Sequence, residues 1–257
     1  MRISIIGAGA MGGAIALGLA ESGFNPADII ISNPHEDKLK VFQEKGMAVT
    51  TDNKEACKGA DLVFIAVKPW ILPDVIKEIK DTLHYNYQAV SVIAAGISGA
   101  DLKGWFDYNG YCPTISLSMP NTAVKCRESM TFIVPVTGND RNPDIDLYRR
   151  LGEVKVIEER LLPAATSLAS CGIAYALRYI RAATEGGVQL GFRASEAQEI
   201  VAQTVKGAAL LLADGAHAEA EIDKVTTPGG LTIRGLNAME AEGFTAAVIR
   251  GLVKPLA

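Results

Sequence analysis

A glycine-rich segment near the start of the chain has the spacing of a dinucleotide-binding turn. Gly7-Ala8-Gly9-Ala10-Met11-Gly12 follows a predicted strand over 2–6 and opens a predicted helix. Gly7 permits a tight turn, Gly9 lets the backbone approach a pyrophosphate, and Gly12 lets the helix pack closely on the strand. An ordinary glycine-rich turn is the alternative, but the strand–turn–helix setting favours phosphate binding at the helix start. The residues expected to bind are Gly7, Gly9, Ala10, Met11 and Gly12.

The end of the second predicted strand bears on which dinucleotide binds. An NAD site usually has an acidic residue there, which accepts a hydrogen bond from the ribose 2′-hydroxyl. This chain instead reads Ser32-Asn33-Pro34. A 2′-phosphate would meet no repulsion and could take hydrogen bonds from Ser32 and Asn33, so NADPH is favoured, with NADH as the alternative. No arginine stands there, Glu36 and Asp37 follow closely, and Asn33 has a second interpretation as a simple turn residue.

Two further strand ends are expected at the same edge of the sheet, where ligands of doubly wound folds bind. Ala66-Val67-Lys68-Pro69 ends the fourth strand, and its backbone can border the cofactor. Lys68 is expected to be a solvated surface cation rather than an acid catalyst. The fifth strand ends in small residues, including Ala95 and Gly96, which suit the close approach of a flat ring. Tight packing alone is the other explanation for these small residues.

The segment Val225-Thr226-Thr227-Pro228-Gly229-Gly230-Leu231-Thr232 is the most informative stretch after residue 158. Thr227 before Pro228 predicts a helix start, with the hydroxyl as N-cap and proline at the first helical position. Two glycines in that turn would cost about 1 kcal/mol each relative to alanine, which points to a role other than helix stability. Bare N–H groups at a positive helix end make a carboxylate site. A flexible turn without a ligand is the alternative.

The elements that position these motifs differ between the two parts of the chain. Residues 1–158 alternate short β-branched runs with helical stretches, the pattern of a parallel sheet covered by helices. The expected strands are 2–6, 28–32, 48–50, 61–67, 89–93, 111–116, 130–136 and 155–157. Residues 159–257 are rich in alanine and leucine and predict an all-helical half. We therefore expect a Rossmann-like doubly wound NADP-binding domain over 1–158 and an all-helical dimerisation and substrate domain over 159–257.

The predicted helix over 196–214 is apolar around much of its circumference. Val201, Val205, Ala208 and Leu212 form one stripe, and neighbouring alanines and leucines widen it. A helical segment of roughly 95 residues has too little volume to bury such a helix on several sides, so we expect it to pack against a second copy. The predicted assembly is a homo-oligomer, either a dimer or an assembly of dimers.

Composition excludes several classes of protein. The 257 residues are 49% hydrophobic and 21% charged, and the net charge of −4 includes no basic block for nucleic acid. No apolar run approaches the ~18 residues of a membrane span, and the N-terminus lacks the pattern of an export signal. We therefore expect a cytoplasmic protein without a membrane or nucleic-acid partner. The scattered cysteines lack the spacing of a disulfide framework or a zinc site, so no metal is expected.

Several segments along the chain carry a resemblance to a known family, and the last three of those named next are its most specific part. They are Gly7–Gly12, Ala66–Pro69, Ala94–Ser98, Met119–Thr122, Glu185–Val188, Gln203–Val205 and Val225–Gly243. Through them the chain resembles, from end to end, the pyrroline-5-carboxylate reductase family, which catalyses the last step of proline synthesis. The resemblance implies that the N-terminal glycines, Asn33, Asn53 and Ala66–Pro69 border NADPH. It also implies that the substrate is faced by Thr227, Gly229, Gly230 and Thr232.

The chain departs from the family pattern in two places. Where the family commonly has Ser-Gly-Ser-Gly-Pro-Ala-Tyr, residues 168–175 read Leu-Ala-Ser-Cys-Gly-Ile-Ala-Tyr, so helix packing near the site is expected to differ. Lys224 stands where related chains often carry asparagine. Its charge either tightens carboxylate binding or is simply solvated.

The resemblance implies a small-molecule substrate, 1-pyrroline-5-carboxylate, which takes a hydride from NADPH at its C=N carbon and becomes L-proline. A protonated imine is already a good electrophile, so no histidine acid is required, and none of the three histidines lies in a motif. Thr232 is the candidate catalytic residue, as a hydrogen-bond partner of the ring nitrogen. Two alternatives stay open: a reductase of another carboxylate substrate, and a non-catalytic NADPH-binding regulator.

Overall fold

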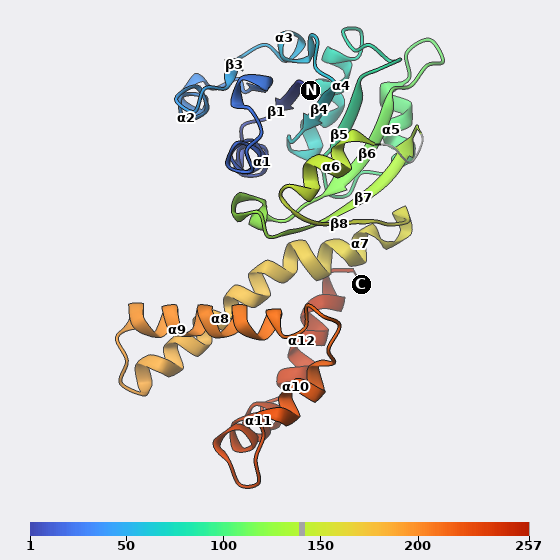
Figure 1. The fold of residues 1–257 in the computed structure, drawn as a ribbon. Coiled ribbons are helices and arrows are strands. Elements are labelled where there is room, and N and C mark those ends of the chain that lie inside the picture. Colours follow the sequence, from blue (N-terminus) through green and yellow to red (C-terminus); the bar gives the residue numbers. More distant parts are fainter. Residues whose placement is uncertain (139–141, 257) are drawn as a thin grey trace. The chain divides into compact units, whose positions relative to one another are not determined.

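The computed structural model describes residues 1–138 and 142–256, and the chain divides into two compact units, Met1–Ser170 and Cys171–Ala257 (Figure 1). Unit 1 contains a sheet with its covering helices, and unit 2 is helical. The predicted architecture, a doubly wound sheet followed by a helical domain, is confirmed. The domain boundary predicted between residues 158 and 159 stays a prediction.

Eight strands of the described residues form one sheet in the order β3-β2-β1-β4-β5-β6-β7-β8. Their bounds are β1 Ile3–Ile6, β2 Ile29–Ser32, β3 Ala48–Thr50, β4 Leu62–Ile65, β5 Ala89–Val92, β6 Thr114–Met119, β7 Ser129–Thr137 and β8 Gly152–Val156. Each strand predicted from the sequence overlaps one of them. Short apolar runs between turn residues were therefore sufficient to locate the sheet.

The central strands are buried on both faces. All residues of β1 and β4 are buried, and Ile3 pairs in parallel register with Ile29 of β2 and Leu62 of β4. Helices that cover both faces of a parallel sheet explain why these strands are continuously apolar instead of alternating. The carboxyl ends of β1, β2, β4 and β5 consequently open together on one edge of the sheet.

Strand β7 runs antiparallel to β6, so the predicted parallel sheet is mostly parallel, with one antiparallel pair. The chain leaves β6 at Met119 and enters β7 at Ser129, with only the short 3₁₀ segment η4, Thr122–Cys126, between them. A parallel crossover needs about a dozen residues or more, so a link of this length reverses the chain instead. Strand β8 then pairs in parallel with β7, after helix α6, Pro143–Arg149.

Helices cover the sheet of unit 1 on both faces (Figure 1). Besides α6 they are α1 Ala10–Glu21, α2 Lys40–Gln43, α3 Asn53–Cys57, α4 Leu72–Ile79, α5 Gly99–Phe106 and α7 Leu162–Ala165. Ile76 of α4 and Leu102 of α5 belong to one buried apolar cluster. Ile15 of α1 and Tyr148 of α6 belong to the other. The two clusters hold the sheet rigid beneath its carboxyl edge.

Unit 2 consists of α8 Gly172–Gln189, α9 Ala194–Leu210, α10 Ala218–Lys224, α11 Leu231–Ala241 and α12 Phe244–Val253. Helices α8 and α9 pack closely, since a Cβ at Gly187 would lie 2.9 Å from the Cβ of Ala197. Many apolar side chains of the unit are nevertheless exposed, among them Leu190 at 83% and Leu231 at 82%. Within the described ranges, no helix is both long and apolar enough to cross a membrane.

Helix α9 is shorter than the predicted helix over 196–214. It ends at Leu210, and the next residues form turns with hydrogen bonds between residues three apart. The Leu212 N–H donates to the Ala209 carbonyl at 3.2 Å and the Gly215 N–H to the Leu212 carbonyl at 3.1 Å. Gly215 has φ +81°, the left-handed conformation that commonly ends a helix. The apolar run Leu210-Leu211-Leu212 therefore lies at an exposed helix end.

Candidate functional site

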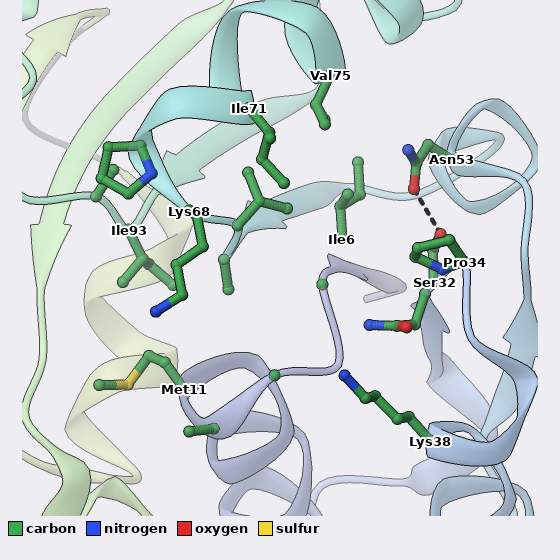
Figure 2. A pocket seen from close by; sticks show the side chains of 18 of the residues that line it. Ile6, Met11, Ser32, Pro34, Lys38, Asn53, Lys68, Ile71, Val75 and Ile93 are labelled. Atoms are coloured by element: carbon green, nitrogen blue, oxygen red, sulfur yellow. Dashed lines mark hydrogen bonds between the residues drawn. The ribbon is translucent and has the colours of Figure 1, made fainter.

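The sheet order reverses at β1, which has β2 on one side and β4 on the other. In doubly wound sheets, ligands bind outside the carboxyl ends of the strands at such a point. A pocket of about 670 Å³ lies there (Figure 2). Of the predicted cofactor residues, its lining includes Gly7, Gly9, Ala10, Met11, Ser32, Asn33, Asn53, Ala66, Val67, Lys68, Pro69 and Ala95. Gly12 and Gly96 do not line it.

The turn between β1 and α1 brings strand and helix into direct contact. Gly7 has φ +104°, and its N–H donates to the Ser32 carbonyl at 2.9 Å. A Cβ at Gly7 would lie 2.6 Å from the Ala66 carbonyl oxygen, so a larger residue would displace the backbone. A Cβ at Gly12 would crowd the Gly7 carbonyl and lie 3.1 Å from the Ala66 Cβ. Gly12 therefore acts on the pocket by allowing this packing.

Gly9 differs from these two glycines because it faces open space. Apart from its chain neighbours, no atom of the described residues lies within 4 Å of where its Cβ would stand. Gly9 is also the N-cap of α1 and supplies no side-chain hydrogen bond to the first helical N–H groups. These N–H groups lie at the positive end of the helix dipole. An open backbone beside bare N–H groups is a cradle for a pyrophosphate.

Hydrogen bonds link the side chains at the end of β2 to α3 and α4. The Ser32 hydroxyl donates to Asn53 Oδ1 at 2.6 Å, and Asn53 Nδ2 donates to Glu78 Oε2 at 2.9 Å. Figure 2 shows the first of these bonds at the rim of the pocket. Asn53 begins α3, where Asp52 is the N-cap. In this arrangement the Ser32 proton is not available for the hydrogen bond predicted to a 2′-phosphate.

Asn33 closes a turn of its own segment. Its Oδ1 accepts the His35 N–H at 3.0 Å, and the residue is 7% exposed. An asparagine that bonds to the backbone two residues ahead forms an Asx turn. The turn role weighed for Asn33 is therefore present, and the residue lines the pocket as well.

Two lysines and no acidic residue are found among the described residues that line the pocket. Lys38 ends the 3₁₀ segment η2, Glu36–Lys38, and Lys68 follows β4. Figure 2 shows both side chains reaching toward the start of α1. Lys68 Nζ also lies 5.9 Å from the ring centroid of Trp70, a residue that is 74% exposed. The positive lining suits an anionic ligand.

Lys38 is absent from the cofactor residues predicted from the sequence. That prediction considers only an arginine directly after the second strand as a basic ligand of the 2′-phosphate. Lys38 lies in the turn that follows and is therefore missed. The signal that would find it is a basic residue in the first helical turn after the strand, where the chain turns back over the carboxyl edge of the sheet. Glu36 and Asp37, which share η2 with Lys38, do not line the pocket.

Part of the pocket lining is apolar. Val67, Ile71 and Val75 come from the segment after β4 and from α4, and Ile93 comes from the end of β5. Gly96 has φ +76° and turns the chain just beyond Ala95. Apolar walls beside a few charged groups suit a ligand with flat rings and phosphates.

The segment Thr227–Gly230 of unit 2 is a β-turn, and the prediction of a helix start at Thr227-Pro228 is wrong. The Gly230 N–H donates to the Thr227 carbonyl at 3.0 Å, and Gly229 has φ +68°. Proline at the second position and a positive-φ glycine at the third are typical of a type II turn. Helix α11 begins at Leu231, with Gly230 as its N-cap. The turn itself thus explains Gly229.

The four predicted substrate residues still gather at the start of α11. Thr227, Gly229 and Gly230 form the turn, and Thr232 is the second residue of the helix and is exposed. The Gly230 N–H, which the prediction assigns to a carboxylate, is engaged in the turn. The N–H groups without an intrahelical acceptor are those of the first helical residues from Leu231 onward. An anion site at this helix start stays a prediction.

The departures from the family pattern have local explanations. Lys224 Nζ forms a salt bridge with Glu221 Oε1 at 2.6 Å on α10, so its charge is paired. Residues Thr166–Cys171 form a π-helical segment, in which the Ser170 hydroxyl donates to the Pro120 carbonyl at 3.2 Å. The Tyr175 hydroxyl donates to the Gly251 carbonyl at 3.0 Å, which ties α8 to α12.

Cys57 lies at the end of α3, beneath the Asn53 edge of the pocket, and is fully buried. Burial, with smaller contributions from the charges of Glu78 and Asp52, raises the pKa of its thiol to about 12. A thiol that stays protonated is a weak nucleophile. Cys57 is therefore a packing residue of α3.

Two family models match the chain. Residues 159–255 match pyrroline-5-carboxylate reductase dimerisation, and residues 2–95 match NADP oxidoreductase, coenzyme F420-dependent. Pyrroline-5-carboxylate reductases 1 and 2 of Dictyostelium discoideum are 36% and 35% identical to the chain, each over 98% of it. The chain spans 48% of the length of the first protein and 90% of the second.

A solved structure shows the same similarity in three dimensions. A pyrroline-5-carboxylate reductase from Coxiella burnetii superposes with a TM-score of 0.87 at 28% identity, over 98% of this chain and 95% of that one. The sequence matches and the structural match therefore cover sheet and helical residues alike. The chain belongs to the pyrroline-5-carboxylate reductase family.

Proposed function

We propose that this chain reduces 1-pyrroline-5-carboxylate to L-proline with a hydride from NADPH, as the last step of proline biosynthesis. Membership of the family supports the reaction. The observation that supports the cofactor is the lining of the pocket at β1, where two lysines and the uncapped start of α1 occur without a carboxylate. A dinucleotide with an additional phosphate is a ligand that such a lining favours.

The chain binds and orients its reactants, while NADPH when bound supplies the hydride. Gly9 and the first N–H groups of α1 are assigned to the pyrophosphate, which the open space at Gly9 and the uncapped helix start support. Lys38 provides the positive charge nearest in sequence to the 2′-phosphate edge formed by Ser32 and Asn33. The apolar wall around Val67 and Ile93 keeps water from the ring. Because a protonated imine carbon is already electrophilic, positioning supplies much of the rate.

The substrate is assigned to the start of α11. Free N–H groups of the first helical turn donate hydrogen bonds to the carboxylate, beside the turn made by Thr227, Gly229 and Gly230. Thr232, in that same helical turn, is assigned the hydrogen bond to the ring nitrogen and is the candidate catalytic residue. These roles rest on the family resemblance and on the exposure of the helix start.

A steady-state assay with pyrroline-5-carboxylate tests the proposal. Turnover to proline is expected with NADPH, and the assay is repeated with NADH and with other cyclic imines and keto acids. A higher kcat/KM for another carboxylate substrate would make the chain a reductase of that substrate. Tight NADPH binding without turnover of any substrate would make it a regulator.

We also propose that unit 2 assembles the chain into a homodimer or an assembly of dimers, with a substrate site that borrows residues from two copies. The match of residues 159–255 to a dimerisation family supports this, as do exposed apolar residues such as Leu190 and Leu231. Light scattering at micromolar concentration is expected to give at least twice the mass of one chain. A monomeric mass would contradict the proposal. A cytoplasmic location stays a prediction.

Replacing Asn33 by aspartate is expected to move cofactor preference toward NADH. Aspartate keeps the oxygen that accepts the His35 N–H, so the turn survives, and it adds a charge that repels a 2′-phosphate. The Kd for NADPH should rise about 10- to 100-fold while that for NADH stays within about threefold, by isothermal titration calorimetry. Equal losses for both cofactors would contradict the assignment of this edge.

The matched variant at the same edge is Lys38→Gln, which removes a cation instead of adding an anion. It is expected to raise the Kd for NADPH about tenfold and to spare NADH, because NADH lacks the 2′-phosphate that the Lys38 ammonium is proposed to bind. Lys40→Gln is the control, since Lys40 is exposed on the neighbouring α2 and does not line the pocket. The same loss in Lys40→Gln would assign the effect to overall charge.

A further inference from the structure

Of the three side chains hydrogen-bonded at the end of β2, Glu78 alone lies outside the pocket. Ser32 and Asn53 line it, whereas Glu78 belongs to α4 and accepts a hydrogen bond from Asn53 Nδ2 at 2.9 Å. An ionised carboxylate accepts hydrogen bonds and donates none. Glu78 therefore fixes which end of the Asn53 amide faces α4. The amide nitrogen points to Glu78, and the amide oxygen is left for Ser32.

The orientation of Asn53 decides where the Ser32 proton goes. Ser32 is fully buried and donates its O–H to Asn53 Oδ1 at 2.6 Å. With that proton engaged, the Ser32 oxygen has only lone pairs to offer the pocket. A reversed amide would instead present an N–H to Ser32, whose own O–H would then be free. Glu78 thus sets from outside whether Ser32 is a donor or an acceptor toward a ligand.

Donors and acceptors at this edge select between the two dinucleotides. A ribose 2′-hydroxyl can donate to the Ser32 oxygen, whereas a 2′-phosphate needs donors. Building on the proposed cofactor, we propose that Glu78 is a positioning residue that lowers the preference for NADPH over NADH. It does so by holding the Asn53 amide so that Ser32 presents an acceptor, and not its O–H, toward the ribose. Lys38 favours the phosphate at the same edge, and the balance between Glu78 and Lys38 sets the cofactor ratio.

Glu78→Gln tests the positioning role with a side chain of the same size. Glutamine can donate as well as accept, so the Asn53 amide is free to turn. By isothermal titration calorimetry, the Kd for NADPH is expected to fall about tenfold, the effect of one hydrogen bond to a charged group, with NADH unchanged within about twofold. Asp74→Asn is the matched control, since Asp74 is a carboxylate of α4 outside the Ser32–Asn53–Glu78 chain. It should leave both Kd values unchanged.

Ser32→Ala shows whether the gain passes through the hydroxyl. Glu78→Gln is expected to give no gain in NADPH affinity when Ser32 is alanine. The gain depends on a hydrogen bond from the Ser32 hydroxyl to the 2′-phosphate, and alanine has no hydroxyl. A gain that persists in that background would overturn the proposal, as would an equal gain for NADH, the same gain in Asp74→Asn, or unchanged affinity throughout.

Two further readouts separate this proposal from other causes. A purely structural role for Glu78 would lower the Tm of the cofactor-free protein and weaken both dinucleotides together. A wild-type chain that binds neither NADPH nor NADH would contradict the proposed function itself. A wild-type chain that binds NADPH, with Glu78→Gln indistinguishable from it, would contradict the role of Glu78 alone.

Discussion

Valine in place of Gly230 is expected to lower kcat/KM for pyrroline-5-carboxylate by about 100-fold or more, while NADPH affinity persists. Gly230 is the N-cap of α11, and a Cβ there would lie 3.1 Å from the Thr227 carbonyl oxygen and closer still to the Thr227 hydroxyl. A branched side chain must displace Thr227 from the start of the helix. The carboxylate then loses access to the free N–H groups. Steady-state kinetics and a proline binding titration measure the loss.

Gly235→Ala provides the control on the same helix. Its Cβ meets no atom of the described residues within 4 Å, and alanine favours helix formation. It is expected to keep both kcat/KM and Kd near their wild-type values. Gly230→Val with unimpaired turnover would remove the start of α11 from the substrate site. A parallel loss of NADPH affinity in Gly230→Val would indicate general disruption instead.

Alanine in place of Gly9 should raise the Kd for NADPH about 100-fold without lowering the Tm of the cofactor-free protein. The backbone of Gly9 has φ −78°, which alanine adopts without strain, and its Cβ would enter open space. That open space is where we propose that the pyrophosphate approaches the start of α1. The added methyl group therefore costs nothing in the free chain and collides with the ligand. Calorimetric titration and thermal unfolding measure the two quantities.

Gly104→Ala serves as the control for Gly9→Ala. Gly104 lies on α5, is exposed, and has no atom of the described residues within 4 Å of its would-be Cβ. It should change neither the Kd nor the Tm appreciably. Unchanged NADPH affinity in Gly9→Ala would show that the pyrophosphate does not approach at this glycine.

The cofactor half of the fold was predictable because its signals are local. The strand at Ile3–Ile6, the glycine turn and helix α1 are adjacent in sequence, and each constrains the next. The strand ends that line the pocket follow from the parallel order of a doubly wound sheet. Twelve of the fourteen predicted cofactor residues accordingly line one pocket, all except Gly12 and Gly96.

Features that depend on pairing or on turn geometry were not predictable in the same way. The direction of β7 is set by the short link between Met119 and Ser129, while its apolar pattern fits either direction. The segment Thr227–Gly230 has residues suited to a helix start and to a type II turn, and the positive φ of Gly229 decides between them. In both cases the residue types suit the two alternatives equally well, so only the backbone geometry of the structure distinguishes them.

Contacts between segments that are distant in sequence could not be predicted from the sequence pattern either. Glu78 reaches Asn53 from another helix, and Ser32 reaches Asn53 across the end of the sheet. The sequence points to Ser32 and Asn53 as cofactor residues, but Glu78 taken alone is an ordinary exposed carboxylate. Only the fold shows that they form one chain of hydrogen bonds whose direction is set by a carboxylate.

Trp70 gives the pocket an optical signal of its own. The chain has two tryptophans: Trp70 is 74% exposed between pocket residues Pro69 and Ile71, and Trp105 packs against the apolar core. Native emission therefore combines a red-shifted component from Trp70 with a blue-shifted component from Trp105. Reduced nicotinamide absorbs where indole emits, so occupation of the pocket quenches the red-shifted component by energy transfer. Because the oxidised cofactor lacks this absorption, the emission reports the presence of NADPH in the pocket, and its oxidation or release can be followed without attaching a dye.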